Sequence, residues 1–418
     1  MSLYKLADGI LETHVTWRDV EEKLQKKFGT KAAFGEKKTA RNISDLKGFM
    51  SKIALIEPNW QNIENDKILP NKFAVKISSQ LPFLEYSKVL KITDENGYDD
   101  QKLTFLGKIL REAHNREVET YKLLERFNHP DVPYTKIYAM KSFSDESDLK
   151  GYILMKYIPD IHITSMSEHI SADDLIPVIR GVATFAALGH NLSDSEKQFV
   201  LGPEFLEYYF NTFLDPTSLE STFEHLRVAF LFLESSETDK LFKIYRHYIQ
   251  NVNKFTRISD LVGLPLIFNH GDLWQSNILY KTENRGKLKL KAIIDWQALS
   301  LLPPGFDMTR LFMGSLSPED RRQRTSELLM IYHETFTQSL GMELFSHQEI
   351  IDSYNLHFPL MSLMVLPGLT PFLDASHLYE PEKSEVREKT KRNMQAIIED
   401  VFEKHEYNME NYADFMKK

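Results

Sequence analysis

The chain of 418 residues contains no cysteine. Disulfides, thiolate zinc sites and a cysteine nucleophile are therefore excluded. Positive charge is also scarce, because 51 lysines and arginines stand against 60 aspartates and glutamates and leave a net charge of −9. Nucleic acids and anionic membranes select basic surfaces, so we expect no nucleic-acid partner and no membrane-surface partner.

Long apolar runs are missing as well. Residues 1–5 lack the apolar segment of a signal peptide, and we expect none. The most apolar late stretch, residues 358–373, is interrupted by three prolines and one glycine. We expect it to be too short and too broken for a membrane span. The sequence therefore predicts a soluble protein, and we expect a cytoplasmic location.

What is present is the composition of an ordinary globular protein, with 42% hydrophobic and 27% charged residues. The length allows two domains or one bilobal unit. Period-two alternation predicts strands over residues 39–43, 50–57, 72–78, 134–143 and 150–158. Helical spacing predicts helices over residues 17–28 and 103–127, and then repeatedly from Ser171 onward, including 203–214, 226–255 and 383–405.

Polar residues with chemical potential are concentrated in two short motifs. The first is Asn-His-Gly-Asp-Leu-Trp-Gln-Ser-Asn, residues 269–277, and the second is Ile-Ile-Asp-Trp-Gln, residues 293–297. Between them, strand-like sequence surrounds turn residues near Gly286, which predicts an antiparallel hairpin. Such a hairpin would return Asn277 and Asp295 to the same open end.

Amide and carboxylate oxygens at that end suit a hard cation such as Mg²⁺. Asp272, five residues before Asn277, would lie on the loop that enters the hairpin and could face a hydroxyl group. An aspartate that caps a turn and an asparagine in a left-handed conformation would explain either residue alone. They would not explain the set.

The order of these motifs resembles that of protein kinases, in which H-R-D-x-x-x-x-N is followed by D-F-G. The His-Gly-Asp and Asp-Trp-Gln forms are similar to the aminoglycoside phosphotransferase and choline kinase superfamily. They are most similar to its choline-kinase-like (CHK) group, which includes insect ecdysteroid kinases and many uncharacterised nematode proteins. The resemblance implies an α+β, bilobal, protein kinase-like fold. A small β-rich N-lobe, residues 1–158, would bind nucleotide, and a larger, mainly helical C-lobe, residues 159–418, would carry catalysis and bind the acceptor.

The resemblance also implies roles for residues of the N-lobe. Lys76, in the middle of a strand, would hold the nucleotide phosphates and pair with Glu117 on the following helix, with Glu112 and Glu119 as alternatives. Gly48 would lie in a turn that covers the phosphates, although a plain surface turn explains it almost as well. Met155 and Tyr157 would lie in the hinge, where backbone groups contact the adenine.

In the C-lobe, Asp272 would orient the acceptor hydroxyl and receive its proton. His270 would brace the catalytic loop, and Asp307 resembles a second bracing position. Asn277 and Asp295 would hold Mg²⁺ on ATP. Gly271 and Gln297 replace residues that protein kinases use, and no A-P-E sequence follows, so a small-molecule acceptor is favoured over a peptide.

The predicted function is therefore ATP-dependent transfer of the γ-phosphate to an alcohol group of a metabolite. The alternative is a catalytically inactive protein that keeps the kinase fold and binds a nucleotide or another ligand. The sequence leaves the acceptor open among sterols, amino alcohols, glycosides and aminoglycosides. It does not distinguish ATP from GTP, and it does not set the oligomeric state.

Overall fold

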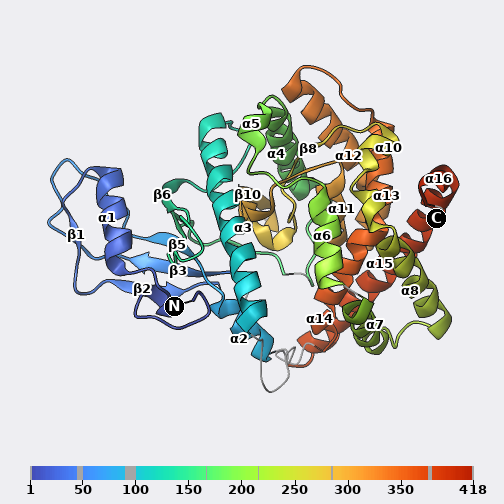
Figure 1. Cartoon of the computed structure of the whole chain (residues 1–418), viewed down its shortest axis with the longest axis horizontal. Coiled ribbons are helices and arrows are strands. Elements are labelled where there is room, and N and C mark those ends of the chain that lie inside the picture. The colour runs from blue at the N-terminus through green and yellow to red at the C-terminus, as the bar shows by residue number, and fades with distance from the viewer. Residues whose placement is uncertain are drawn as a thin grey trace. The chain divides into compact units, whose positions relative to one another are not determined.

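The computed structural model describes residues 2–44, 50–89, 100–165, 167–214, 216–283, 286–374 and 379–416. The chain forms two compact units (Figure 1). The first unit comprises Met1–Phe127, Tyr134–Ile161 and Asp295–Gln297, and the second comprises Asn128–Pro133, His162–Ile294 and Ala298–Lys418. Each unit contains residues from before and after residue 158. These structural units therefore do not test the functional division into residues 1–158 and 159–418, which stays a prediction.

The first unit is built on a five-stranded antiparallel sheet with the strand order β2-β3-β5-β7-β6. Its strands are β2 (Thr39–Asn42), β3 (Ser51–Glu57), β5 (Phe73–Ser78), β7 (Tyr152–Lys156) and β6 (Ile137–Lys141). All five were predicted within a few residues. A separate pair, β1 (Ala33–Phe34) and β4 (Trp60–Gln61), was not, because two-residue strands show no period.

The helices of the first unit cover the sheet. They are η1 (Ile10–Glu12), α1 (Trp17–Phe28), α2 (Leu81–Val89) and α3 (Asp100–Phe127). Helix α1 begins with a capping box of Thr16 and Asp19 and ends at Gly29, whose φ of 58° is left-handed. Val20 and Leu24 of α1 are buried in a cluster that includes Phe73 and Val75 of β5. The alternate residue of β5, Lys76, therefore faces away from α1, and its ion pair with Glu117 shows that it faces α3.

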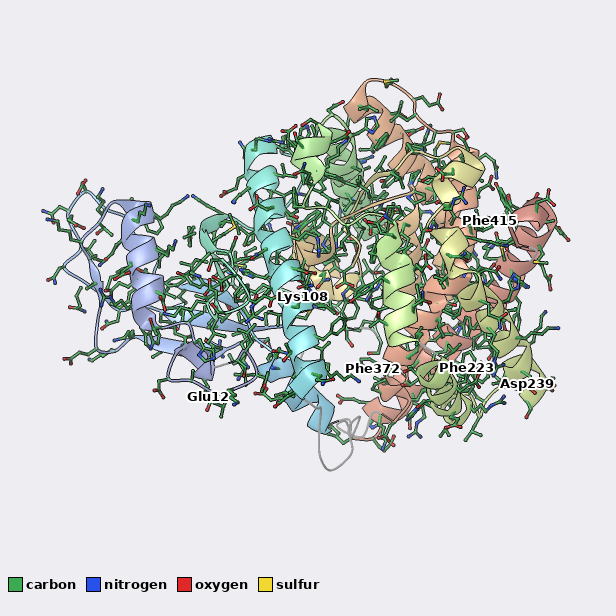
Figure 2. The ribbon with its side chains drawn as sticks, in the orientation of Figure 1. Glu12, Lys108, Phe223, Asp239, Phe372 and Phe415 are labelled. Atoms are coloured by element: carbon green, nitrogen blue, oxygen red, sulfur yellow. The ribbon has the colours of Figure 1, made fainter. Side chains whose placement is uncertain are left out.

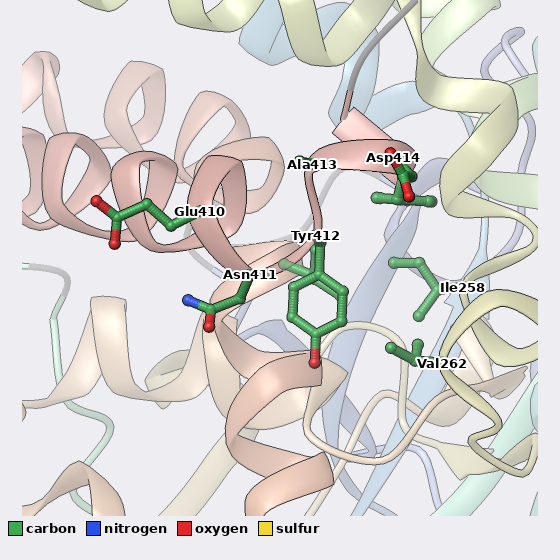
Figure 3. A pocket seen from close by; sticks show the side chains of 9 residues that line it. Ile258, Val262, Glu410, Asn411, Tyr412, Ala413 and Asp414 are labelled. Carbon is green, nitrogen blue, oxygen red and sulfur yellow. The ribbon is translucent and has the colours of Figure 1, made fainter.

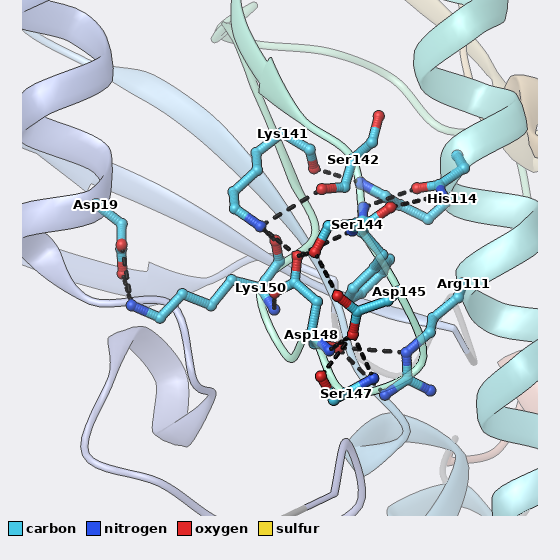
Figure 4. Close-up of polar contacts among 12 residues, drawn as sticks. Asp19, Arg111, His114, Lys141, Ser142, Ser144, Asp145, Ser147, Asp148 and Lys150 are labelled. Carbon is cyan, nitrogen blue, oxygen red and sulfur yellow. Dashed lines mark hydrogen bonds and ion pairs between the residues drawn. The ribbon is translucent and has the colours of Figure 1, made fainter.

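The loop between β6 and β7 is held by charged groups (Figure 4). Lys141 Nζ lies 2.6 Å from the Asp148 carboxylate, and Arg111 of α3 donates to the Asp148 carbonyl. Burial opposes ionisation, yet the hydrogen bonds from Lys141 and from backbone N–H groups lower the pKa of Asp148 to about 2. Lys150 then reaches Asp19 of the capping box at 2.7 Å. These contacts hold the hairpin that leads to the predicted hinge.

Helices dominate the second unit. They are α4 (Ala172–His190), α5 (Asp194–Lys197), α6 (Glu204–Phe213), α7 (Pro216–Ala229), α8 (Ser235–Gln250), α9 (Val252–Phe255), α10 (Ile258–Val262), α11 (Phe306–Ser315), α12 (Pro318–Leu340), α13 (His347–Leu369), α14 (Pro371–Asp374), α15 (Glu382–Asn411) and α16 (Ala413–Met416). This content, beside the β-rich first unit, confirms the predicted α+β fold.

The expected helix over residues 226–255 was wrong in its extent. The structure divides it, because α7 ends at Ala229 and α8 begins at Ser235 with a capping box formed by Glu234 and Glu237. Phe223 of α7 stacks on Phe242 of α8, with ring centroids 4.3 Å apart (Figure 2 labels Phe223). The two helices therefore form a hairpin whose core is aromatic.

Two short strand pairs adjoin the motif of residues 269–277 in the second unit. Strands β9 (Ile278–Thr282) and β10 (Leu288–Ile293) form the predicted antiparallel hairpin, with Ile278 opposite Ile293 and Gly286 at a φ of 80° in the turn. Strands β8 (Ile267–Asn269) and β11 (Ser300–Leu302) form the second pair, which was not predicted.

One described segment, His347–Asp374, is long and apolar enough to cross a membrane by length and composition. In the structure 61% of its apolar window is buried. Pro359 and Pro367 do not interrupt this stretch, because α13 continues through both, whereas α13 ends at Leu369 and Pro371 begins α14. Its buried side chains include the polar Ser353, Asn355 and His357, which fits a core helix of the second unit.

Candidate active site

The His-Gly-Asp motif, residues 269–277, begins at Asn269, which is the last residue of β8. The Asn269 side chain connects this motif to the start of α11. Its Nδ2 donates to the carbonyls of Ile267 and Leu302 at 3.1 and 3.0 Å, and its Oδ1 accepts from Asp307 N at 3.3 Å. The side chain is buried, and each of these bonds satisfies a polar group that would otherwise be costly to bury. Asn269 thus joins both strands of the β8–β11 pair to the start of α11.

Asp307 braces the backbone of the motif, as the resemblance implied. Its carboxylate accepts from the backbone N–H of His270 at 2.5 Å and of Gly271 at 2.9 Å. Burial raises the pKa of Asp307 to about 7, although both N–H groups act in the opposite direction. The motif requires glycine at 271, since φ is 80° and a Cβ there would lie 2.0 Å from the Ala298 carbonyl oxygen.

His270 is held by the backbone through both ring nitrogens. The Asp272 N–H can only donate, so Nδ1 accepts it at 3.3 Å and Nε2 carries the proton towards the Ile294 carbonyl, 3.0 Å away. The ring is buried. This arrangement suits the predicted bracing role better than proton transfer to a substrate.

Asp272 is partly exposed and lies between an amide and a guanidinium. Asn277 Nδ2 donates to the Asp272 carbonyl at 2.9 Å and approaches its Oδ2 at 3.4 Å. Arg310 Nη1 lies 2.5 Å from Asp272 Oδ1, and the two side chains are 20% and 25% exposed. The Arg310 contact was not foreseen. Its signal was its place in α11, one helical turn after the bracing residue Asp307.

Two aromatic residues lie beside this ion pair. The Arg310 guanidinium is 5.5 Å from the centre of the Trp274 ring. Trp274 Nε1 is buried and has no hydrogen-bond partner among the described residues. Burial raises the pKa of Tyr209, on α6, while the charge of Arg310 lowers it and that of Asp272 raises it. The charges of Asp272 and Arg310 thus both act on the Tyr209 phenol.

Lys76 lies between two carboxylates in the first unit. Its Nζ is 2.6 Å from Glu117 Oε2 and 2.6 Å from Asp295 Oδ1. Burial alone would lower the pKa of Lys76, but the two carboxylates raise it above its ordinary value. The predicted Lys76–Glu117 pair is confirmed. The alternatives fail, because Glu112 is exposed and Glu119 pairs with Lys122 at 2.7 Å.

Glu117 is less satisfied than Lys76. Burial and the charge of Asp295 outweigh Lys76 and raise the pKa of Glu117 to about 7. Its Oε1 is buried without a hydrogen-bond partner in the described part of the chain. One turn further along α3, Tyr121 is fully buried, and burial together with the charges of Glu117 and Asp295 raises its pKa. Tyr121 was not foreseen as part of the site.

The segment that begins at Asp295 has a constrained backbone. Asp295 has a φ of 67°, which is uncommon for a residue with a side chain and typical of functional sites. Arg116 Nη1 donates to the Gln297 carbonyl at 2.7 Å. Helix α3 therefore fixes the backbone of this segment through Arg116 and also supplies Glu117 to the Lys76 ion pair. Arg116 was also missed by the sequence analysis, although it directly precedes Glu117.

Asn277 belongs to the second unit, where its backbone carbonyl accepts a hydrogen bond from the N–H of Ile294 at 2.9 Å. Ile294 directly precedes Asp295 in the chain. Among the described residues no three His, Asp or Glu side chains gather as a metal site. Asn277 belongs to the second unit and Asp295 to the first, so the Mg²⁺ site that they were expected to share stays a prediction.

Two of the remaining predicted residues, Met155 and Tyr157, lie in or directly after a strand of the first sheet. Met155 pairs with Ala74 of β5 and Ile137 of β6, so it lies inside the sheet. Tyr157 directly follows the end of β7. Gly48 lies outside the described residues. The nucleotide-binding roles of all three stay predictions.

A cavity of about 360 Å³ lies elsewhere in the second unit (Figure 3). Ile258 and Val262 of α10 and Leu356 of α13 line it with apolar groups, and Glu410 and Asp414 add carboxylates. None of the predicted site residues lines it. It is therefore a feature separate from the catalytic motif.

The chain belongs to the family DUF1679, described as uncharacterized oxidoreductase dhs-27, whose model matches residues 3–409. A curated relative, the uncharacterized kinase-like protein D1044.1 of Caenorhabditis elegans, is 32% identical over 127 residues. This match covers 30% of the chain and 31% of the relative, so the chain spans about a third of that protein's length. The relative agrees with the predicted kinase-like resemblance.

Distant similarity to solved structures extends over most of the chain. An ethanolamine kinase from Plasmodium vivax is 13% identical with a TM-score of 0.41, and the match covers 86% of this chain and 81% of that one. A GDP complex of aminoglycoside 2′-phosphotransferase-IIIa is 13% identical with a TM-score of 0.40, covering 93% and 99%. Similarity at this level assigns no activity.

Proposed function

We propose that the protein transfers the γ-phosphate of ATP to a hydroxyl group of a small molecule. The observation that carries the proposal is the placement of Lys76, 2.6 Å from both Glu117 and Asp295. A buried lysine between a helix glutamate and the aspartate of the second motif is the arrangement that holds nucleotide phosphates in kinases. A purely structural ion pair would not require the Asp295 backbone to adopt a φ of 67°.

In this proposal Lys76 binds the α- and β-phosphates and Glu117 orients Lys76. Asn277 and Asp295 are the residues that would hold Mg²⁺, because an amide oxygen and a carboxylate are ligands that this ion takes, and Asn277 Nδ2 donates to Asp272 so that its Oδ1 is the atom available to a cation. When bound, Mg²⁺ would neutralise charge on the phosphates. Asp272 would accept a hydrogen bond from the acceptor hydroxyl and take its proton as the new P–O bond forms and the bond from the γ-phosphorus to the β–γ bridging oxygen breaks, which releases ADP.

The oxidoreductase description of the family raises a second candidate function. Dinucleotide-binding oxidoreductases commonly use a parallel sheet and a G-x-G-x-x-G turn. This chain has no two glycines separated by a single residue, and the strand pairs of its described sheets are all antiparallel. Both features favour phosphotransfer over a nicotinamide-dependent reaction.

Binding and transfer can be tested separately. Calorimetry with ATP should show an affinity that requires Mg²⁺, and Asp295→Asn should weaken it. Incubation of the protein with labelled ATP and a metabolite extract, followed by mass spectrometry, should then identify a phosphorylated alcohol. Mg²⁺-dependent ATP binding without transfer to any hydroxyl compound would favour the inactive, ligand-binding alternative. Folded protein with no ATP affinity would contradict both.

A further inference from the structure

We propose that the acceptor is a neutral or anionic alcohol rather than an amine, and that Arg310 determines this choice. The inference rests on the proposed function, because it concerns the molecule whose hydroxyl group meets Asp272. Its basis is the contact of Arg310 with both Asp272 and Trp274.

Sites that bind ammonium groups use carboxylates and the faces of aromatic rings. Both are present beside the catalytic motif, but both are already in contact with a cation of the chain itself. Arg310 Nη1 lies 2.5 Å from Asp272 Oδ1, and the guanidinium is 5.5 Å from the centre of the Trp274 ring. A cationic acceptor would have to displace Arg310 or approach a like charge.

The local charge leads to the same conclusion. Asp272 and Arg310 neutralise each other, and Tyr209 is an uncharged phenol. The other carboxylate close to the motif, Asp307, is buried and accepts the N–H groups of His270 and Gly271. Of these two carboxylates, Asp272 is paired with Arg310 and Asp307 is occupied by backbone N–H groups, so neither is free to balance an ammonium group. A neutral or anionic acceptor meets no such difficulty.

The unused hydrogen-bond donors indicate what the acceptor offers instead. Trp274 Nε1 is buried and has no partner among the described residues. Arg310 contacts Asp272 through Nη1, and its side chain is 20% exposed, so its other N–H groups are open to a ligand as well as to water. One buried donor on Trp274 and a partly exposed guanidinium favour a ligand that brings oxygen acceptors, such as hydroxyl, carbonyl, carboxylate or phosphate groups.

The test uses three small alcohols as probes with the full chain, Mg²⁺ and a non-hydrolysable ATP analogue. Choline is cationic, 3,3-dimethyl-1-butanol is its neutral isostere, and 3-hydroxypropanoate is anionic. Ligand-observed NMR gives the three dissociation constants. We expect choline to bind at least about tenfold more weakly than its isostere, as like-charge repulsion near a guanidinium implies.

Arg310→Gln should reduce that preference by about tenfold or more, because it removes the resident cation and frees Asp272 and Trp274. Arg180→Gln is the matched control. Arg180 is exposed on α4, so this substitution removes the same charge at a place away from the motif. If Arg310→Gln does not fold, Arg310→Lys should keep the preference. Trp274→Phe should weaken 3-hydroxypropanoate alone by losing the Nε1 donor.

Three results would overturn the inference: equal or tighter binding of choline by the unchanged protein, an unchanged preference in Arg310→Gln, or no binding of any probe by either protein. None of them depends on phosphoryl transfer. Failure of the proposed function would instead show as absence of Mg²⁺-dependent ATP binding in the calorimetric experiment. The two failures can therefore be distinguished.

Discussion

The ammonium group of Lys76 lies 2.6 Å from the carboxylate of Asp295, although 219 positions separate them in the sequence. Lys76 also contacts Glu117, so one cation balances two carboxylates in a buried place. With both carboxylates ionised, one cation and two anions leave a net negative charge, which agrees with the raised pKa of Glu117. This balance leads to the first two predictions.

Lys76→Met should destabilise the first unit. It leaves Glu117 and Asp295 without their cation, and we expect its unfolding free energy to fall by about 3–5 kcal/mol. Lys52→Met is the control, because Lys52 is equally buried but pairs with the half-exposed Glu85 at 3.1 Å, so its change should stay below about 1 kcal/mol. Urea denaturation measures both, and equal losses would contradict the argument.

Glu117→Gln should affect nucleotide binding more than stability. Since burial already raises the pKa of Glu117 to about 7, a neutral side chain is tolerated there. Lys76 loses one of its two charge-assisted contacts, and we expect Mg²⁺–ATP affinity to fall by about tenfold. Glu119→Gln is the control. Glu119 lies two residues further along the same helix in an exposed ion pair with Lys122, so this substitution should leave the affinity unchanged. Similar calorimetric affinities in both variants would remove Glu117 from the site.

Asp272→Asn should separate catalysis from binding. It keeps the size of the side chain and removes its charge and basicity, so turnover should fall by roughly 10²–10⁴-fold once an acceptor is known. The Asp272–Arg310 pair is partly exposed, so stability should change by less than about 1 kcal/mol. Mg²⁺–ATP affinity should be retained, whereas Asp295→Asn should lose it. Parent-like turnover in Asp272→Asn would exclude this residue from the mechanism.

Stability should decrease as pH rises, through Asp307. Its pKa is raised from 3.8 to about 7, so the folded state holds a proton that the unfolded chain has already lost at intermediate pH. The contribution is fully present below about pH 4 and disappears as pH passes about 7, with an upper limit of about 4 kcal/mol.

Asp307→Asn should therefore flatten the dependence of the unfolding free energy on pH between about 4 and 7. Glu117, whose pKa is also raised to about 7, leaves a smaller dependence of the same sign in the variant. Denaturation curves across this pH range provide the measurement. Parallel profiles for parent and variant would show that Asp307 is ionised throughout.

A buried charge pair holds α12 to α15 in the second unit. Arg321 is 2% exposed, and its Nε lies 2.7 Å from Asp400 Oδ2. Asp400→Asn leaves this guanidinium without a counter-charge and should lower the unfolding free energy by about 3–5 kcal/mol. Glu399→Gln, the adjacent residue on an exposed pair with Arg322, should lower it by less than about 1 kcal/mol. Thermal denaturation measures both losses of stability. A larger loss in Glu399→Gln than in Asp400→Asn would contradict the argument for the Arg321–Asp400 pair.

The sequence by itself determined the local features of the site. The β9–β10 hairpin could be predicted because alternation and turn residues act over a few positions. The resemblance to known kinases implied the pairing of Lys76 with Glu117, while spacing alone left Glu112 and Glu119 open, and the structure brings Lys76 and Glu117 to 2.6 Å. The α+β class also came from that resemblance, and the strand and helix periodicities agreed with it.

Only the tertiary structure decided which side chains from distant segments meet. Arg310 contacts Asp272 because Asp307 and Asn269 fix the start of α11 against the catalytic motif. Strands β8 and β11 have three residues each, too few for a period to be seen, and their pairing joins segments about thirty positions apart. Local pattern carries no information about such contacts, because burial and charge balance select among many arrangements only once the chain has folded.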